Sequence, residues 1–466
     1  MTDAASPRSL RVAVVGSGPS GFYAVEHLQK EAGAVEIDLF DRLPTPYGLV
    51  RGGVAPDHPK IKSVTRIYDK LAAHPSFRFL GNVEVGRDLT HAELLTHYDA
   101  VIYAVGAQTD RSLGVPGESL VGSHAATEFV AWYNGHPDYR DLHFDLSQES
   151  VAVIGLGNVA MDVTRILASS ADELAGTDIA DHALEALRAS RVRTIYVLGR
   201  RGPVQAAFTN PEIRELGDLH EADAIVAPSE MELDPASAAW LAATDERTPA
   251  RNIETLRGYA ARGATGKPKQ IVLRFCVSPT ALIGVAGRVT AIAVARNRLV
   301  PSGGDVKAEA TDQIETIPAG LVFRSVGYKG VPIAGVPFDA RRSVVPNASG
   351  RVLTDAGAAT TVPGTYVTGW IKRGPSGIIG TNKPDSVETV ARLLEDHAAG
   401  TLPRASGAGR SAIDGMLAER GVDVVTFDDW RRLDAIEQAR GTAAGRPRVK
   451  VTRVAEMLDL IRSGRA

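Results

Sequence analysis

The sequence predicts an α/β fold made of two doubly wound units, one inserted into the other, each with a parallel sheet between helices. Two observations predict it. A glycine-rich pattern of strand, turn and helix occurs twice, around 12–21 and again around 151–160. Two apolar strands, 100–107 and 321–328, each end in a small-residue turn, and the second pattern lies between them. These strand ends therefore mark where the chain leaves an outer unit and returns to it.

The first pattern is an apolar strand that runs into the motif G-x-G-x-x-G at Gly16 to Gly21. The first glycine allows a tight turn, the second lets the backbone approach a pyrophosphate, and the third lets helix and strand pack closely. The next strand, 35–41, brings Asp41 to its end. A carboxylate there holds a ribose hydroxyl and repels a 2′-phosphate, so this dinucleotide-binding, Rossmann-like unit is predicted to take FAD or NAD. The alternative explanation is that Asp41 is an ordinary turn residue at the end of a strand.

The second pattern is the same motif with Ala160 in the last position, and its next strand, 194–198, leads into Gly199-Arg200-Arg201-Gly202. Two guanidinium groups after that strand suit a 2′-phosphate, which predicts NADPH rather than NADH. The simpler explanation is a solvated pair of arginines on a loop. Two dinucleotide sites in one chain favour a flavoprotein that receives electrons from a nicotinamide nucleotide.

The composition excludes several other classes of protein. The formal net charge of −3 over 466 residues gives no global reason to expect nucleic acid as a partner. Cys276 is the only cysteine, which excludes an internal disulfide, a Cys-x-x-Cys redox pair and an iron–sulfur cluster held by the chain's own thiolates. We expect it to be a small core residue within a strand at 271–277. The spacing of His and carboxylate residues predicts no metal site.

Hydropathy predicts a cytoplasmic protein without a membrane span. The longest apolar candidate, 281–295, is broken by Arg288 and is expected to form a pair of strands. The N-terminus reaches its first strand without a separate hydrophobic region, so that strand is assigned to the fold rather than to a secretion signal.

The helix expected after Pro59 has one apolar and one basic stripe. Helical spacing relates Ile61, Val64, Tyr68 and Leu71 on one face and Lys62, Arg66 and Lys70 on another. Further along, 369–382 is a glycine-rich turn before a helix, where backbone amides can meet an anion or a polar ring edge. The segment after 401 is expected to be a peripheral extension, with Arg446, Arg448 and Lys450 solvated.

Four segments carry a resemblance to a known family: 44–60, 157–162, 199–209 and 369–382. Together they resemble the adrenodoxin-reductase-like ferredoxin–NADP reductases, above all the actinobacterial members. The resemblance implies a fold like that of the disulfide reductases, in which the NADP-binding domain (109–325) is inserted into the FAD-binding domain. The FAD-binding domain is then made of 1–108 and 326–466, the latter including the C-terminal extension.

The resemblance also implies the site residues. The implied FAD contacts are Gly16, Gly18, Ser20, Gly21, Asp41, Leu49, Val85, Trp370, Gly377, Ile378 and Ile379. The implied NADP contacts are Gly157, Asn158, Val159, Arg200, Arg201, Glu212 and Gly377. His58 and Glu215 match the catalytic His and Glu that line the flavin. Asp41 departs from the family pattern, which usually has Glu. Taken alone, His58 could simply shape a helix start, and Glu212 and Glu215 could be solvated helix carboxylates.

The activity implied by the resemblance is that of an FAD-dependent ferredoxin–NADP oxidoreductase: hydride passes from NADPH to FAD, and single electrons pass to an iron–sulfur protein such as a ferredoxin or an adrenodoxin. Because ferredoxins tend to be acidic, a basic docking surface is expected. It would comprise Lys60, Lys62, Arg66, Lys372 and Arg373. Two alternatives stay open: a redox sensor that binds FAD and NADPH without turnover, and a related flavin oxidoreductase with a different acceptor.

Overall fold

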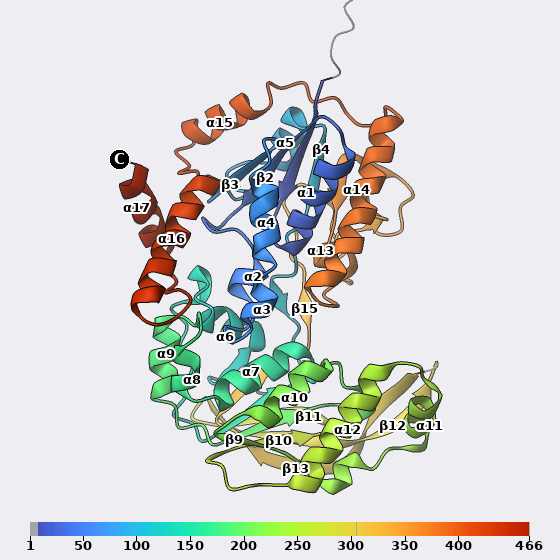
Figure 1. Cartoon of the computed structure of the whole chain (residues 1–466). Coiled ribbons are helices and arrows are strands. Elements are labelled where there is room, and N and C mark those ends of the chain that lie inside the picture. Colours follow the sequence, from blue (N-terminus) through green and yellow to red (C-terminus); the bar gives the residue numbers. More distant parts are fainter. Residues whose placement is uncertain (1–7, 304, 466) are drawn as a thin grey trace, which may run out of the picture.

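Two sheets organise the computed structural model, which describes residues 8–303 and 305–465 and has two lobes (Figure 1). The first lobe is built on a seven-stranded sheet with the order β16-β17-β18-β4-β1-β2-β3. Its strands are β1 (Leu10–Val15), β2 (Val35–Asp41), β3 (Phe77–Gly81), β4 (Ala100–Tyr103), β16 (Asn347–Ala348), β17 (Arg351–Leu353) and β18 (Thr361–Val367). Strands β18, β4, β1, β2 and β3 run parallel, and β16 and β17 add an antiparallel edge.

The second lobe is built on a six-stranded parallel sheet with the order β6-β14-β7-β8-β10-β9. Its strands are β6 (Ser123–Ala125), β7 (Ser150–Ile154), β8 (Thr194–Leu198), β9 (Ala222–Val226), β10 (Lys269–Arg274) and β14 (Leu321–Arg324). Parallel strands buried on both faces read as nearly continuous apolar runs, which is why β4, β7 and β14 are so apolar in the sequence.

An antiparallel sheet extends the second lobe, and a short ribbon joins the lobes. The sheet consists of β11 (Val277–Val285), β12 (Arg288–Ser302) and β13 (Asp305–Pro318), so the predicted strand pair at 281–295 is confirmed. In the ribbon, β5 (Thr109–Asp110) pairs antiparallel with β15 (Tyr328–Lys329). The two connections between the lobes thus run side by side, close to the predicted exit and return points.

Helices cover both main sheets. Those of the first lobe are α1 (Pro19–Glu31), α2 (Leu49–Gly52), α3 (Pro59–Lys62), α4 (Thr65–Ala72), α5 (His91–His97), α13 (Trp370–Arg373), α14 (Asn382–Ala398), α15 (Arg410–Glu419), α16 (Phe427–Ala443) and α17 (Val454–Arg465). Those of the second lobe are α6 (Ala126–Tyr133), α7 (Asn158–Ala168), α8 (Ala171–Ala175), α9 (Asp181–Arg188), α10 (Asn210–Asp218), α11 (Pro235–Ala243) and α12 (Arg247–Arg262). Short 3-10 turns are η1 (Pro137–Tyr139), η2 (Pro203–Gln205), η3 (Pro228–Met231) and η4 (Ile379–Thr381).

The helix predicted after Pro59 is divided into α3 and α4 by Ser63 and Val64. Tyr68 is fully buried, as the apolar stripe predicts, but Ile61 is 44% exposed. The break rotates the two halves of the stripe relative to each other, so a single helical periodicity does not describe both.

The prediction of a peripheral C-terminal segment is wrong. Side chains of α16 and α17, including Trp430, Leu433 and Ile461, belong to the core of the first lobe. The loop between these helices reaches the second lobe beside α9 (Figure 1), where Arg446 pairs with Asp181 at 2.8 Å. The C-terminal segment therefore packs on one lobe and contacts the other.

Cys276 lies at the junction between β10 and β11 rather than inside a strand, and its φ is +52°. Burial raises the pKa of its thiol to about 11, so the thiol is protonated at neutral pH. Within 8–303 and 305–465, no helix has both the length and the apolar character needed to cross a bilayer.

Candidate functional site

The first glycine turn has the shape of a pyrophosphate cradle. Gly16 has a φ of +106°, and a side chain there would come within 2.6 Å of the Ala104 carbonyl oxygen. A Cβ on Gly21 would lie 2.0 Å from the carbonyl oxygen of Gly16. In contrast, a Cβ on Gly18 would meet no protein atom within 4 Å. Two glycines thus serve close packing, and the middle one faces open space where a phosphate can approach.

Asp41 ends β2 directly beside this turn. Its Oδ2 accepts a hydrogen bond of 2.9 Å from the backbone N–H of Ser17, and its Oδ1 accepts one from the N–H of Leu43, also at 2.9 Å. The Ser17 hydroxyl also donates to Oδ2, at 2.5 Å. A carboxylate has about four acceptor positions, so one remains for a ribose hydroxyl. The structure therefore brings the predicted ribose-binding residue to the glycine turn, although part of its capacity is used to hold the turn itself.

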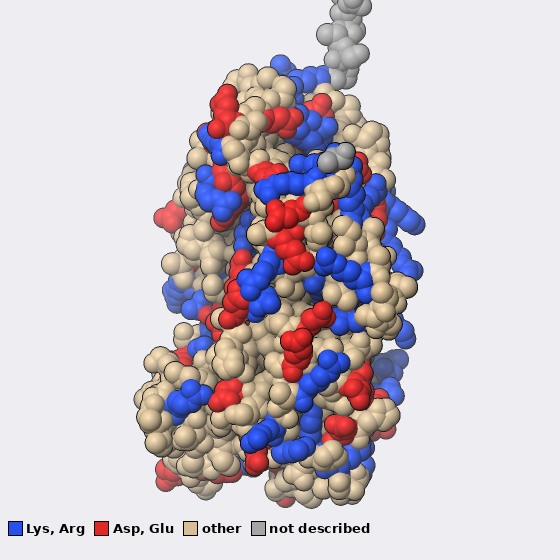
Figure 2. Space-filling view, turned by 90° about the vertical axis from the view of Figure 1, so that its left-hand side faces the viewer, with Lys and Arg blue, Asp and Glu red and all other residues tan. Residues whose placement is uncertain are grey.

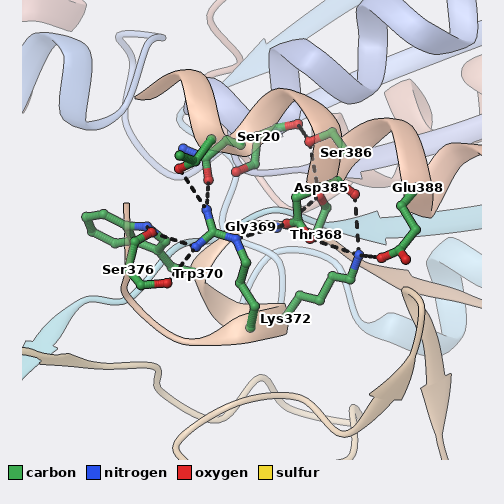
Figure 3. Close-up of polar contacts among 12 residues, drawn as sticks. Ser20, Thr368, Gly369, Trp370, Lys372, Ser376, Asp385, Ser386 and Glu388 are labelled. Carbon is green, nitrogen blue, oxygen red and sulfur yellow. Dashed lines mark hydrogen bonds and ion pairs between the residues drawn. The ribbon is translucent and has the colours of Figure 1, made fainter. Parts of the chain in front are cut away.

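The C-terminal turn at 369–382 meets the first glycine helix. Gly369 has a φ of +76°, and a Cβ there would lie 2.2 Å from the Ser20 hydroxyl oxygen, so only glycine permits this approach. Figure 3 shows the polar contacts that fix the turn: Asp385 accepts the Gly369 N–H, and the Trp370 indole N–H donates to the carbonyl of Ser376 at 3.1 Å. The Trp370 ring also stacks on Tyr328, with ring centres 5.3 Å apart.

Two of the predicted FAD contacts are large apolar side chains left open to solvent. Leu49, at the start of α2, is 45% exposed, and Ile378, before η4, is 57% exposed. Ile379 is partly buried against the core of the first lobe. Exposed apolar groups of this size favour a binding surface, and a flat aromatic ring would cover them. Val85 packs against the core in the loop after β3.

The second glycine turn repeats the first. A Cβ on Gly155, whose φ is +138°, would lie 2.2 Å from the Ser325 carbonyl oxygen, whereas a Cβ on Gly157 would meet nothing within 4 Å. Asn158 begins α7, and its Oδ1 accepts a hydrogen bond of 2.8 Å from the backbone N–H of Thr209. Val159 packs against the core of this lobe. As in the first turn, the first glycine is therefore packed against a carbonyl oxygen, and the second faces open space.

Arg200 and Arg201 follow β8, as the sequence predicts. Arg200 is exposed, and Arg201 is partly buried with an ion pair of 2.9 Å to Asp305 at the end of the β12–β13 hairpin. Beside Arg201 lies a cavity of about 570 Å³, which is also lined by Gln205, Ser237 and Trp240. The two cations and the adjacent space fit the phosphorylated ribose end of NADPH.

The two predicted catalytic residues come together at the junction of the lobes. His58 lies in the first lobe, just before α3, and Glu215 lies on α10 of the second lobe. Their side chains are 2.9 Å apart between Nε2 and Oε2. The His58 Nδ1 lies 3.9 Å from the Asp162 carboxylate. A His and a Glu that are 157 positions apart in the chain thus form one ion pair between the lobes.

A buried arginine holds this pair in place. Arg165, on α7, contacts the carboxylates of Asp57 at 2.6 Å, Asp162 at 2.6 Å, Glu212 at 3.2 Å and Glu215 at 3.3 Å. Asp57 is in the first lobe next to His58, and the other three carboxylates belong to the second lobe. Arg165 therefore ties the His58 loop to α7 and α10, and it is only 3% exposed.

Charge crowding shifts the pKa values of the cluster. Burial lowers the pKa of His58, but the hydrogen bond to Glu215 and the nearby Asp162 and Asp57 outweigh it, so its pKa is raised. The His58 hydrogen bond is the main cause of a lowered Glu215 pKa. Burial, and then the like charge of Asp162, raise the Glu212 pKa to about 7. A carboxyl group whose pKa is raised in this way, beside a charged partner, is typical of proton-transfer sites.

The same three residues, His58, Glu212 and Glu215, lie within metal-binding distance of one another, with candidate ligand atoms no more than 4.8 Å apart. The cation that both carboxylates already contact is the Arg165 guanidinium. Glu212 faces this cluster and is 7% exposed, so its placement fits a role beside His58 better than a solvated helix carboxylate.

Two of the five predicted docking cations are not available to a partner. Lys62 points inward to Asp178 at 2.6 Å, and Lys372 is 7% exposed and pairs with Asp385 and Glu388 (Figure 3). Burial of an ammonium group requires a carboxylate partner, and both lysines have one. Lys60 and Arg66 are exposed, and Arg373 is partly buried.

The cations of the C-terminal segment follow the same rule. The prediction that Arg446, Arg448 and Lys450 are solvated is wrong. The Arg446 side chain is only 6% exposed and pairs with Asp181, Arg448 pairs with Asp434, and the buried Lys450 lies 3.4 Å from Asp178. On the side of the molecule where α16 and α17 lie, positive and negative side chains are interspersed (Figure 2). That side therefore shows no broad basic face for an acidic partner.

Sequence reasoning missed the residues that connect the lobes. Asp162 and Arg165 lie on α7, four and seven positions after Asn158, which places all three along one helical face. That spacing is a usable signal, because charged residues on one face of an otherwise apolar helix require polar partners nearby. Asp57 gave no separate signal beyond its position next to His58.

The fold and this site define a class of protein: an oxidoreductase with two dinucleotide-binding lobes and an acid–base pair between them. The family model that matches residues 10–197 is described as pyridine nucleotide-disulphide oxidoreductase. This confirms the predicted fold class of two Rossmann-like units.

Relatives and solved structures define the family more closely. The NADPH-ferredoxin reductase FprA of Mycobacterium leprae is 47% identical over 96% of this chain and 98% of its own length. The mitochondrial NADPH:adrenodoxin oxidoreductase of Salvelinus fontinalis is 42% identical over 99% of this chain and 92% of its own length. The structure of Mycobacterium tuberculosis FprA in complex with NADPH matches with a TM-score of 0.92 and 45% identity, covering 98% of this chain and all of that one. The chain belongs to the family of NADPH–ferredoxin and NADPH–adrenodoxin reductases, so the resemblance seen in the sequence is confirmed.

Proposed function

We propose that this protein is an FAD-containing oxidoreductase that takes hydride from NADPH and passes single electrons to an iron–sulfur protein of the ferredoxin or adrenodoxin type. The observation that carries the proposal is the ion pair of His58 and Glu215, which joins two lobes that each contain a glycine turn of matching shape. Membership in a family whose named members are NADPH-dependent reductases of ferredoxin and adrenodoxin supports it.

FAD is assigned to the first lobe. Its pyrophosphate would lie against Gly16, Gly18 and Gly21 at the start of α1, and its adenosine ribose against Asp41. The exposed Leu49 and Ile378 would cover the flavin ring, together with Trp370. Ser20, Val85, Gly377 and Ile379 complete the proposed FAD contacts. When bound, a flavin accepts two electrons as hydride and releases them one at a time, which is the chemistry that the protein's own side chains do not supply.

NADPH is assigned to the second lobe. Its pyrophosphate would lie at Gly157, Asn158 and Val159, and its 2′-phosphate at Arg200 and Arg201. Glu212 and Gly377 would lie near the nicotinamide end. We place the boundaries of the NADP-binding domain at 109 and 325, next to the β5–β15 ribbon, with 1–108 and 326–466 forming the FAD-binding domain.

The residues at the lobe junction hold and move protons. Hydride transfer moves two electrons and one proton, whereas each iron–sulfur centre takes one electron, so the site must exchange protons with solvent in every turnover. His58, with its raised pKa, donates to Glu215, and Glu212 holds a proton up to a pH of about 7. Arg165 fixes these carboxylates in place from α7. We infer that these side chains exchange protons with the flavin or nicotinamide ring when it is bound.

The acceptor is proposed to dock on the exposed cations Lys60 and Arg66, which lie on α3 and α4 after the His58 loop. Both are in the chain segment that follows directly on His58, so a partner bound there would lie close to the lobe junction. Charge complementarity with an acidic iron–sulfur protein would mainly raise the association rate.

The decisive experiment mixes the purified protein with NADPH under anaerobic conditions, follows bleaching of the flavin absorbance, and then adds oxidised ferredoxin. Rapid bleaching followed by flavin reoxidation and ferredoxin reduction would support the proposal. Bleaching that persists until oxygen is added would point to another acceptor. A flavin that NADPH does not bleach would favour a sensor and contradict the proposed activity.

A further inference from the structure

The antiparallel sheet of β11, β12 and β13 touches the loop that carries Arg200 and Arg201. This sheet is an addition to the parallel core of the second lobe, and a dinucleotide fold does not need it. The register between β12 and β13 is irregular here: Ala295 pairs with Ile314 and Asn297 with Ala310, so three residues of β13 oppose one residue of β12. A bulge of this kind interrupts the pairing and re-aims neighbouring side chains. Asn297 lies beside the bulge, and its side chain is directed to the arginine loop.

Two hydrogen bonds hold the carbonyl groups of the two arginines, and a third joins the two donors to each other. The Asn297 Nδ2 donates to the carbonyl of Arg200 at 2.7 Å, and the backbone N–H of Cys276 donates to the carbonyl of Arg201 at 3.0 Å. The backbone N–H of Asn297 donates to the carbonyl of Cys276 at 2.7 Å, so the two supports are joined to each other. The carbonyl groups of both arginines are therefore held by one unit, the β10–β11 junction together with β12.

The direction of the Asn297 amide is fixed by chemistry. A backbone carbonyl can only accept, so the group that faces Arg200 must be the amide nitrogen. The same nitrogen donates to the Ser278 hydroxyl at 2.8 Å. Asn297 is 7% exposed, and its Oδ1 is buried without a hydrogen-bond partner among the described residues. A buried amide with one unpartnered oxygen costs stability, so the contacts of its nitrogen must offset that cost.

We propose that Asn297 is a positioning residue that sets the preference for NADPH over NADH, by holding the Arg200–Arg201 loop in the conformation that receives a 2′-phosphate. This inference rests on the proposed function, which assigns the 2′-phosphate to these arginines. The loop lies between two glycines, Gly199 and Gly202, and glycine-flanked segments lose much conformational entropy when they are ordered. A hydrogen bond that orders the loop before binding removes part of that cost from the nucleotide.

The test compares two ligands that differ only in the phosphate. Calorimetry measures the binding of 2′,5′-ADP and of 5′-AMP to the flavin-loaded native protein and to the variants Asn297→Ala and Asn297→Leu. Loss of one ordering hydrogen bond is expected to weaken 2′,5′-ADP about five- to tenfold and to leave 5′-AMP within about twofold. In steady state, KM for NADPH should rise by a similar factor, while kcat and KM for NADH stay unchanged.

Ser278→Ala is the matched control, since it removes the second acceptor of the Asn297 nitrogen and leaves the bond to Arg200. It should bind both nucleotides like the native protein. Asn297→Leu fills the volume of the amide without a donor, so it carries the test if Asn297→Ala does not fold. Flavin content and the melting temperature verify that each variant is folded.

Different outcomes overturn different claims. Native-like discrimination in both Asn297 variants, or an equal loss of both nucleotides, would overturn the role of Asn297 and leave the proposed function intact. A loss of 2′,5′-ADP binding in Ser278→Ala as large as in Asn297→Ala would overturn it too, because the Arg200 bond would then not be the cause. Equal affinity of the native protein for the two nucleotides would overturn the assignment of the phosphate to Arg200 and Arg201, and this inference with it.

Discussion

The two glycine turns of this protein are nearly identical in shape, and yet the strands that follow them end in opposite charges. In each turn the first glycine is packed against a backbone carbonyl and the middle glycine faces open space. In the first lobe, Asp41 turns back and binds its own glycine loop. In the second lobe, the Arg200 side chain is exposed, and its backbone carbonyl accepts a hydrogen bond from Asn297 of the antiparallel sheet.

This difference shows that two properties of a dinucleotide site are determined by different residues. The glycines determine that a pyrophosphate can approach, and they do so equally in both lobes. The residue at the end of the next strand determines which nucleotide is accepted, because a carboxylate repels a 2′-phosphate and a guanidinium binds it. Variants of the two lobes should therefore fail in different ways.

The largest expected effect on nucleotide affinity comes from adding a side chain at the first glycine of each turn. Gly16→Ala places a Cβ 2.6 Å from the Ala104 carbonyl oxygen at a φ of +106°, and the strain should lower FAD affinity on the order of a hundredfold. Gly155→Ala should keep its flavin and lose NADPH binding to a similar degree. The ratio of flavin absorbance to protein absorbance, followed by anaerobic bleaching with NADPH, measures the two losses separately.

Gly258→Ala is the control for these two variants, because a Cβ on this helix residue meets nothing within 4 Å. It should behave like the native protein in both measurements. A Gly16→Ala protein that purifies with full flavin content would contradict the assignment of FAD to the first lobe.

The next largest effect is expected from removing the positive charges of Arg200 and Arg201. Changing Arg200 and Arg201 together to Gln removes two charge-assisted contacts, so KM for NADPH should rise about 30-fold or more while KM for NADH changes little. Steady-state kinetics with an artificial electron acceptor measure both. Arg298→Gln, at a 73% exposed side chain on β12, is the control for loss of one positive charge. Equal increases for the two nucleotides would mean that these arginines do not read the 2′-phosphate.

The sequence predicted those parts of the molecule in which local pattern and chemistry coincide. Strand, glycine turn and helix follow one another within ten residues, so the sequence alone predicted both dinucleotide-binding turns. It also predicted where the strand after each turn ends. The nesting of the two units followed from the strand ends that flank the second turn. The pairing of His58 with Glu215 came only from the family resemblance, since no local pattern relates residues so far apart.

Sequence failed where burial decides the role of a charge. Lys62 and Arg66 belong to the same basic stripe, and yet Arg66 is exposed and Lys62 is partly buried against Asp178. Asp178 itself is also approached by Lys450 from the C-terminal segment. No periodicity contains this information, because the carboxylate that draws each lysine inward belongs to another lobe.

The junction between the lobes should make stability depend on pH. The Glu212 pKa is raised to about 7 in the folded protein, so the folded state binds a proton that the unfolded state has already released. The contribution is therefore full below the unfolded value near 4.5 and is lost as the pH rises through 7. Glu212→Gln should flatten the fall in stability between pH 5 and 8, by at most about 3 kcal/mol.

Thermal unfolding of both proteins across that pH range measures the effect. The His58 pKa is raised as well, so a smaller decline with rising pH should persist in the Glu212→Gln protein. A variant whose melting temperature falls as steeply as that of the native protein would show that Glu212 does not hold the proton.

The smallest expected effect distinguishes the outer surfaces of the two lobes. Lys60→Glu reverses an exposed charge on the first lobe, and Lys307→Glu makes the same change on β13 of the second. If an acidic iron–sulfur protein docks beside α3, only the first variant should lower kcat/KM for ferredoxin, by a few-fold at low salt, and weaken its dependence on ionic strength. Since screening removes the attraction, the two variants should converge at high salt. Equal salt dependence for both would place the docking surface elsewhere and leave the hydride step, which NADPH bleaching reports, unaffected.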